Sequence, residues 1–349
     1  MADLADDRHR SLAAGAVTDR EPPDSPTDPH GEPVSVVIVN HNAGQLLADC
    51  LAAALGQARQ VILVDNASEA GTFEAAVAAF VADSRLTIIR SAENDGFAAG
   101  CNRGAALAEE PMLLFLNPDC ILGAGSLGRL RHAVETTEQV GMAGGLLTDL
   151  DGNEQGGARR SVPTPWRSFV RGFGLGRLAW LAPGLFSDFY LHRQPLPAEP
   201  VDVEAVSGAL TLVAREAFAD AGPWDEGFFL HCEDLDLCMR FRKAGWRVLF
   251  VPDATAVHHR GMCSRARPLA VEWHKHRGMI RFYRKHFRAA YPYGLFGLVI
   301  AGVWLRFSAV AAVQAIGSLR RRPEPVARPV SRPSAPGAAR MAASPTLPS

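Results

Sequence analysis

Four short apolar runs recur in the first third of the chain, and stretches with helical spacing separate them. The runs lie at 34–39, 61–64, 86–89 and 112–116, and the helical stretches near 44–56, 71–82 and 97–109. Continuous apolar runs of this length are typical of strands that are buried on both faces. Strands that alternate with helices predict a parallel sheet covered by helices, so the fold class is α/β.

A polar group follows each of these four strands. The groups are Asn40-His41-Asn42, Asp65-Asn66-Ala67-Ser68, Glu93-Asn94-Asp95-Gly96 and Asn117-Pro118-Asp119. Any one of them could be a turn or a helix cap, because Asn, Asp and Ser favour such positions. Ligands of parallel sheets bind beyond the carboxyl ends of the strands, so four polar groups on that edge favour a binding site.

Two of these groups indicate how a nucleotide could bind. Asp65 ends a buried strand, where a carboxylate can accept a hydrogen bond from a base N–H or a ribose hydroxyl. The stretch 94–104 has spaced glycines and opens a helix, so its backbone could approach an anionic ligand. The glycines are a weak signal, since small residues also let a helix pack closely on a sheet.

Asp119 is the best candidate for a metal ligand. A hard divalent cation such as Mg²⁺ or Mn²⁺ prefers oxygen ligands and can bridge a diphosphate. One carboxylate is too few for a cage made of protein alone, which suits a metal shared with substrate phosphates. His258 and His259 follow another strand-like run, 248–251, and a neutral imidazole there could be a further ligand. The alternatives are a turn aspartate and a surface histidine pair.

Glu233, Asp234 and Asp236 place three carboxylates within four positions. Acids this close repel one another and are costly to desolvate, so we expect a helix start or a site. The predicted helix ends near Gly245, and its dipole stabilises acids in the first turn. Capping of the helix N-terminus explains one of the three acids. A second carboxylate at the helix start could act as a general base that accepts a proton from an attacking hydroxyl group. Asp236 lies farther into the helix and is predicted to be structural.

The remaining segments define the limits of the domain and an irregular region within it. Residues 151–200 are irregular and are predicted to be an insertion or loops over the site. Residues 1–32 and 318–349 are rich in Pro, Arg and small residues, which predicts disordered tails. The domain then spans 33–290, with a nucleotide-binding half at 33–125 and a catalytic, acceptor-binding half at 200–265.

The C-terminal end combines basic and apolar character. Residues 273–288 have apolar positions at helical spacing on a largely basic segment, which favours an anionic membrane surface. The following segment, 291–317, is apolar over about the length that a spanning helix needs. Arg306 lies near its middle and would cost about 2.5–3.5 kcal/mol in a bilayer. We therefore favour a helix in the membrane interface, with packing on the domain as the alternative.

The composition of the chain argues against several classes of protein. The 349-residue chain has a net charge of −1, so no bulk charge directs it to nucleic acid. Its six cysteines form no CxxC pair, which fits neither a zinc knuckle nor a disulfide framework. The first residues are acidic and lack the apolar core of a signal peptide. These features predict a cytoplasmic enzyme.

Taken in order, the motifs resemble a family 2 glycosyltransferase. The strand ends described above are continued by Ser207-Gly208-Ala209, Gly222-Pro223-Trp224-Asp225-Glu226, Glu233-Asp234-Leu235-Asp236, Ala244-Gly245-Trp246 and Val251-Pro252-Asp253. The resemblance covers about 34–290 and is greatest to the bacterial rhamnosyltransferase-type branch. It implies a GT-A fold, which is a Rossmann-like, mostly parallel sheet flanked by helices, here followed by C-terminal helices.

The resemblance also implies roles for single residues. Asp234 would be the catalytic base, with Glu233 beside it, and Asp119 would bind a divalent metal with His258 or His259. Acceptor binding would fall to Trp224, Asp225 and Glu226. Donor binding would fall to Asn40, Asn42, Asp65, Asn66, Asn94, Gly96, Asn102, Asn117 and Asp119.

The implied reaction is an inverting sugar transfer, with rhamnose from dTDP-rhamnose as the donor sugar. The implied acceptor is a polyprenyl-linked glycan or a polysaccharide of the cell envelope. The enzyme would act in the cytoplasm as a peripheral protein of the inner membrane face, with Mg²⁺ or Mn²⁺ as cofactor.

Two positions depart from the family pattern. Asn117 stands where the metal motif usually has its first acid, and Trp224 stands where the family usually has Phe. A tryptophan there could stack on a sugar ring or belong to the core. The rival functions are a nucleotidyltransferase and a catalytically silent nucleotide-sugar-binding protein. The first strand lacks a basic, glycine-rich triphosphate signature, and the presence of both Asp119 and Asp234 argues for catalysis.

Overall fold

The structure is a computed structural model that describes residues 31–186, 188–259 and 268–320. The predicted tails therefore lie mostly outside the described residues, although Glu32 already belongs to a strand and 318–320 to a helix. The chain divides into one unit that ends at Phe307 and another that begins at Ser308. The sheet and all the candidate site residues belong to the first unit.

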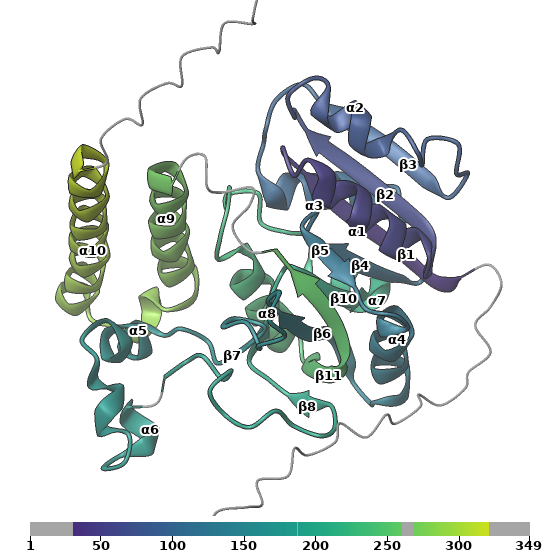
Figure 1. The fold of residues 1–349 in the computed structure, drawn as a ribbon. Coiled ribbons are helices and arrows are strands. Elements are labelled where there is room, and N and C mark those ends of the chain that lie inside the picture. The colour runs from purple at the N-terminus through teal and green to yellow at the C-terminus, as the bar shows by residue number, and fades with distance from the viewer. Residues whose placement is uncertain (1–30, 187, 260–267, 321–349) are drawn as a thin grey trace, which may run out of the picture. The chain divides into compact units, whose positions relative to one another are not determined.

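The four predicted strands lie side by side in one sheet. They are β1 (Glu32–Asn40), β2 (Ala58–Asn66), β3 (Leu86–Ser91) and β4 (Met112–Leu116). Their order is β3-β2-β1-β4, and every pairing among them is parallel (Figure 1). They are connected by α1 (Gln45–Leu55), α2 (Thr72–Val77), which is shorter than predicted, and α3 (Phe97–Ala106). The α/β prediction is confirmed, and the four strand ends meet at one edge.

The other half of the sheet is mixed. Its strands are β5 (Cys120–Leu122), β6 (Val140–Thr148), β8 (Val201–Asp202), β10 (Leu210–Ala214) and β11 (Arg247–His258). β10 lies between β4 and β6 and is antiparallel to both, whereas β11 is parallel to β6. β5 and β8 pair with β11 in antiparallel fashion, so the parallel expectation holds throughout the first half and, in the second half, for the pairing of β6 with β11. A separate ribbon joins β7 (Arg159–Arg160) to β9 (Ala205–Val206).

Helices cover both faces of the sheet, as the alternation within β1 shows. Val36 and Ile38 join the core beneath α1 and α4 (Ser126–Thr136). Val37 and Val39 point to the other face, towards α3 and α8 (Glu233–Lys243); α7 (Arg215–Ala221) also packs on this face. A Cβ atom on Gly100 or Gly104 of α3 would overlap these two valine side chains. The glycines of 94–104 thus include two that serve close helix–sheet packing.

The irregular segment 151–200 contains short helices. They are α5 (Pro165–Gly172), η1 (Leu175–Leu178) and α6 (Pro183–Phe186). The hydroxyl of Tyr283 donates a hydrogen bond to Ser168 Oγ at 2.7 Å, which ties α5 to α9 (Pro268–His286).

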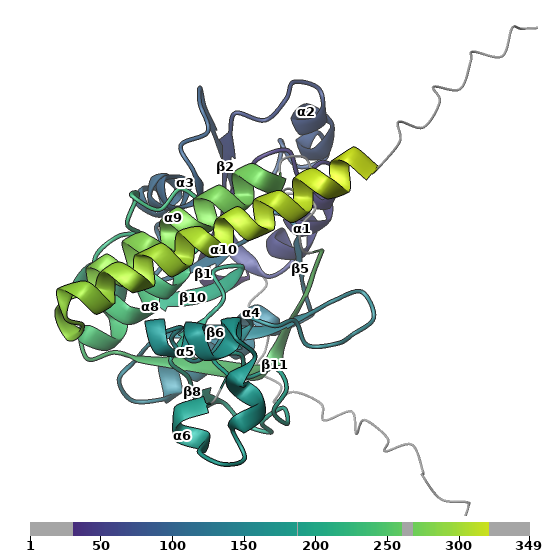
Figure 2. The ribbon, with the colours of Figure 1, turned by 90° about the vertical axis from the view of Figure 1, so that its left-hand side faces the viewer.

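The C-terminal helices pack through aromatic rings. A short turn, η2 (Arg288–Ala290), connects α9 to α10 (Tyr293–Arg320). Figure 2 shows the two helices beside each other over the part of α10 that ends at Phe307. Trp273 of α9 contacts Trp304 and Phe307, with ring centroids 5.1 and 5.5 Å apart. Arg306 places Nη1 3.2 Å from Nε2 of the buried His276. By length and composition, residues Tyr293–Ile316 could cross a membrane.

Asp236 of α8 is fully buried, and an arginine, a lysine and a histidine contact its carboxylate. Arg240 Nε donates to its Oδ2 at 2.8 Å, and Lys285 Nζ and His286 Nε2 each lie 2.8 Å from Oδ1. Burial works to raise the pKa of Asp236, but the bonds from His286, Lys285 and Arg240 lower it well below its ordinary value. The predicted structural role of Asp236 is thus to join α8 to α9.

Replacement of Asp236 by Ala should lower the free energy of unfolding by about 3–5 kcal/mol, because it leaves the largely buried Arg240 and His286 without their shared carboxylate. Urea denaturation followed by circular dichroism measures the change. The matched control is Asp202→Ala, which breaks the exposed ion pair with Arg247 and should change stability little. Equal effects of the two variants would contradict the structural role of Asp236.

Candidate active site

Asp65 is held in place by the neighbouring strand ends. It is fully buried, and the parallel register sets it beside Asn40 on one side and Arg90 on the other. Asn40 Nδ2 donates to Asp65 Oδ1 at 2.9 Å, and Arg90 Nε lies 3.5 Å from Oδ2. Ser68 adds a backbone N–H at 3.3 Å. Asn40 thus orients Asp65 at the sheet edge.

The other predicted donor-binding amides tie loops together. Asn42 has a left-handed backbone, with φ of 57°, and its Oδ1 accepts the Glu69 N–H at 2.8 Å. Asn66 Nδ2 donates to the carbonyl of Gly96 at 2.8 Å, and Asn94 Oδ1 accepts the Gly96 N–H at 3.0 Å. Among the described residues, the buried Oδ1 of Asn66 has no hydrogen-bond partner, which leaves an acceptor at this edge.

Gly96 connects this edge to the segment ahead of α8. Its φ of 92° suits glycine, and a Cβ there would overlap the backbone of Phe229. The next residue, Phe97, donates its N–H to the carbonyl of Phe229 at 3.0 Å. The loop before α3 and the segment before α8 are therefore in direct backbone contact.

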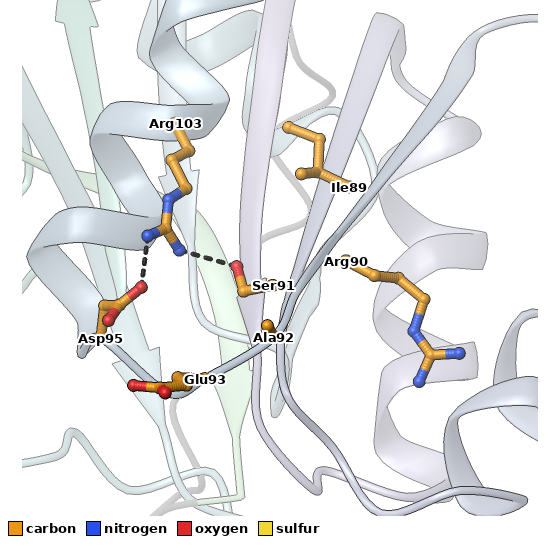
Figure 3. Close-up of a pocket in the computed structure, with 7 residues that line it drawn as sticks. All are labelled: Ile89, Arg90, Ser91, Ala92, Glu93, Asp95 and Arg103. Atoms are coloured by element: carbon orange, nitrogen blue, oxygen red, sulfur yellow. Dashed lines mark hydrogen bonds and ion pairs between the residues drawn. The ribbon is translucent and has the colours of Figure 1, made fainter.

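A pocket of about 380 Å³ opens beside the end of β3. Figure 3 shows its lining residues, which are Ile89, Arg90, Ser91, Ala92, Glu93, Asp95 and Arg103. Arg103 of α3 donates to Ser91 Oγ at 2.7 Å and pairs with Asp95, which fixes one wall. Sequence reasoning missed Arg90 and Arg103. The available signal was that Arg90 ends the strand next to the one that carries Asp65.

Asp119 and His258 come together where β5 pairs with the end of β11. Asp119 Oδ1 lies 3.4 Å from His258 Nε2, and both side chains are largely shielded from solvent. His258 Nδ1 lies 3.0 Å from Gln155 Oε1, a contact that requires a proton on Nδ1. Nε2, the other ring nitrogen, faces the carboxylate. A ligating histidine fixed through its other nitrogen is the usual arrangement in metal sites.

This donor set fits a divalent cation. Ligand atoms of Asp119, Cys120 and His258 all lie within 4.8 Å of one another. A carboxylate oxygen and a neutral imidazole nitrogen suit Mn²⁺ or Mg²⁺ when phosphate oxygens complete the shell. His259 is placed differently, since its backbone N–H donates to the carbonyl of Asp119 at 2.9 Å and its side chain is outside the cluster. Of the two predicted histidines, the structure thus brings His258 to Asp119.

The backbone just before α8 is strained. His231 and Cys232 both adopt left-handed conformations, with φ of 69° and 72°, which non-glycine residues rarely do. Gly278 of α9 allows this turn to approach closely, because a Cβ there would overlap the carbonyl of His231. Strain of this kind persists where surrounding structure imposes it and is concentrated at functional sites. The backbone conformation of His231 and Cys232 sets the orientation of Glu233 and Asp234 in the first turn of α8.

Asp234 is paired with Arg160 of β7. Arg160 Nη2 donates to Asp234 Oδ2 and also to the carbonyl of Val206 at 3.0 Å. Gly208 N–H and Leu235 N–H donate to the same carboxylate at 3.3 and 2.8 Å. Burial works to raise the pKa of Asp234, but the charge and hydrogen bond of Arg160 lower it below its ordinary value. No spacing rule pointed to Arg160, which lies far away in the irregular segment.

Glu233 behaves in the opposite way. It is buried, and its Oε2 has no hydrogen-bond partner within the described part of the chain. Burial, with the neighbouring charge of Asp234, raises the pKa of Glu233 to about 8. Glu233 is therefore largely protonated at neutral pH, whereas Asp234 is ionised. Two acids whose pKa values are pushed apart can take different roles, and the ionised one is available as a base.

The predicted acceptor residues are held from several sides. Trp224 is 2% exposed and packs edge-on against Phe97 and Phe115, which favours the core alternative over stacking on a sugar ring. Asn102 Nδ2 donates to the Trp224 carbonyl at 2.9 Å and to Glu226 Oε1 at 2.8 Å. Asp225 pairs with two cations of α9, namely Arg281 and Lys285.

Comparison with known proteins gives the family. A family model described as "Glycosyltransferase like family 2" matches residues 30–279. An N-acetylglucosaminyl-diphospho-decaprenol L-rhamnosyltransferase of Mycobacterium tuberculosis is 32% identical over 243 residues, which are 64% of this chain and 75% of the relative. Rhamnosyltransferase WbbL of Escherichia coli K12 is 28% identical over 44% of this chain and 53% of its own.

Among solved structures, a mannosyltransferase of Pyrobaculum calidifontis matches at a TM-score of 0.47 and 18% identity, over 86% of this chain and 80% of that one. Because this structural similarity is low, the family assignment rests on the sequence matches. The family model spans most of the chain, and the ordered motifs at the sheet edge and at the start of α8 lie within it. The chain belongs to glycosyltransferase family 2.

Proposed function

We propose that this glycosyltransferase moves rhamnose from dTDP-rhamnose to a lipid-linked or polysaccharide acceptor during synthesis of cell-envelope glycan. Two relatives are rhamnosyltransferases by name, and one of them is named for a decaprenol-diphosphate acceptor. The nucleotidyltransferase alternative has no support in the family assignment. The silent-binder alternative is disfavoured because both the Asp119–His258 pair and an ionised Asp234 are present.

The observation that carries the proposal is the pairing of Asp119 with His258, whose ring is held through its other nitrogen by Gln155. Asp119 and His258 would hold Mg²⁺ or Mn²⁺, with Gln155 keeping Nε2 of His258 directed at the site. When bound, the cation would stabilise the negative charge of the departing nucleoside diphosphate. The missing first acid, at Asn117, is compatible with a metal held jointly with the donor.

The donor nucleotide would bind along the edge formed by the strand ends. Asp65 is fixed by Asn40 and Arg90 and can accept a hydrogen bond from a base or ribose. The pocket beside β3 offers the guanidinium groups of Arg90 and Arg103. Asn66 contributes an unused buried acceptor. Because β1, β2 and β4 are adjacent, this edge leads from Asp65 to the segment that carries Asp119.

Asp234 would be the general base. The acceptor hydroxyl oxygen attacks the anomeric carbon from the face opposite the leaving diphosphate, and its proton passes to the Asp234 carboxylate. A single displacement of this kind inverts the anomeric configuration. Arg160 keeps Asp234 ionised and oriented, while the neutral Glu233 avoids a second buried negative charge beside it.

A lipid-linked acceptor would require the enzyme to act at the cytoplasmic face of the inner membrane, as a peripheral protein. α9 and α10 support this location, since residues Tyr293–Ile316 are mostly exposed and apolar. Arg306, which counts against a spanning helix, lies beside His276 of α9. Lipid contact along one face of α10 is compatible with that packing.

Replacement of Asp234 by Asn should abolish the proton acceptor and lower kcat by about 100-fold or more. The assay measures transfer of rhamnose from dTDP-rhamnose to a polyprenyl-diphosphate N-acetylglucosamine acceptor. Donor affinity, measured by calorimetry, should stay nearly unchanged and also shows that the variant is folded. Asp253→Asn removes an exposed acid of β11 and serves as control. Full transfer by the Asp234 variant would remove this residue as the base.

Replacement of Asp119 by Ala should weaken metal-dependent donor binding by about tenfold or more, because the carboxylate ligand is lost. Calorimetric titration with dTDP, with Mn²⁺ and with chelator, measures the change. Asp253→Ala is the control and should retain the difference between the two conditions. If wild type binds dTDP equally with metal and with chelator, Asp119 does not hold a cation there.

A further inference from the structure

The segment 165–186, called the aromatic insert below, presents large apolar side chains to solvent. Exposed fractions range from 43% to 80% for Trp166, Phe169, Phe173, Trp180, Leu181 and Leu185. Such a concentration in about twenty residues is far from the scattered apolar exposure of ordinary surfaces. A surface of this kind needs a partner.

The insert is an organised element. Thr164 caps α5 by accepting the Arg167 N–H at 3.1 Å, and Pro165 occupies the first turn. Trp166 stacks on Phe169 at 5.6 Å, and its Nε1 donates to the carbonyl of Leu185 at 2.8 Å. The rings therefore pack on one another and fix the fold of the insert, while their outer surfaces remain exposed.

The charge of the insert selects the kind of partner. The sequence has no Asp, Glu or Lys between 155 and 187, but the insert carries Arg167, Arg171 and Arg177. Arg167 and Arg171 are paired with Glu204 and Asp188, which lie outside the insert. Arg177 is exposed and donates to the backbone carbonyl of Gly174. Tryptophan, phenylalanine and leucine with arginine as the only charge match elements that lie in an anionic membrane interface.

The position of the insert relates it to the proposed base. The chain reaches α5 only a few residues after Arg160, which binds Asp234. The bond from Tyr283 to Ser168 fixes α5 against α9, near the end at which α9 leads into α10 (Figure 1). A lipid surface at the insert would bring an acceptor headgroup close to the strand that orients Asp234.

We propose that the aromatic insert docks on the surface of an anionic phospholipid bilayer, independently of α10. Its helices are too short to cross a membrane, so the side chains enter only the headgroup region and the upper acyl chains. The benefit to catalysis rests on the proposed lipid-linked acceptor, but the docking itself does not.

Sedimentation of the full-length protein with phosphatidylglycerol–phosphatidylethanolamine vesicles tests the proposal. The insert variant combines Phe173→Ser, Trp180→Ser and Leu181→Ser, and should bind these vesicles at least about tenfold more weakly than wild type. The matched control combines Val81→Ser, Leu107→Ser and Leu150→Ser, which are also exposed apolar positions, and should bind like wild type. A third variant, Leu298→Ser with Leu305→Ser, measures the contribution of α10.

Wild-type vesicle binding by the insert variant overturns the proposal, whatever the α10 variant does. Loss of a dimer in analytical ultracentrifugation, with unchanged vesicle binding, assigns the surface to a second copy of the chain and also overturns it. Calorimetric binding of dTDP reports on the proposed function separately. If wild type fails to bind dTDP but sediments with vesicles through the insert, the docking stands and the proposed donor is wrong.

Discussion

Three carboxylates in the first turn of one helix are a constraint that the catalytic half of the structure must satisfy. Asp236 is neutralised by Lys285 and His286 of α9 together with Arg240, Asp234 by Arg160 of β7, and Glu233 by keeping its proton. Like charges this close cannot all be buried ionised, so each acid has a different environment. These pairings neutralise the charges, and they also hold β7, α8 and α9 together as one assembly.

The sheet edge at which we propose that the donor binds is attached to that assembly by hydrogen bonds. Phe97 at the start of α3 donates to the carbonyl of Phe229, and Asn102 binds the segment that contains Trp224 and Glu226. A shift of the loop before α3 would therefore be transmitted to the turn before α8, where His231 and Cys232 adopt left-handed conformations. If the donor binds at this edge as proposed, its binding would be coupled to the orientation of Asp234 through these direct contacts.

Local patterns predicted the features that depend on neighbours in sequence. The four strands, the polar residues at their ends and the structural role of Asp236 all follow from periodicity, strand direction and helix position. The burial of the strands on both faces fails for β3, because it lies at the edge of the sheet and its residues are partly exposed. Long-range partners were beyond such patterns, since Gln155 lies 103 residues from His258 and Arg160 lies 74 residues from Asp234. Trp224 shows the same limit, because core and sugar-stacking roles use the same side chain and only its packing against Phe97 and Phe115 separates them.

The central claim is that Arg160 keeps Asp234 ionised for proton transfer. The most direct measurement is the pH dependence of kcat/KM for wild type, Arg160→Lys and Arg160→Gln at saturating metal. Loss of the guanidinium leaves burial to raise the pKa of Asp234, so the acid limb of Arg160→Gln should lie at higher pH than that of wild type. Arg160→Lys keeps a positive charge and should fall between them. An acid limb that is the same in all three proteins would contradict the claim.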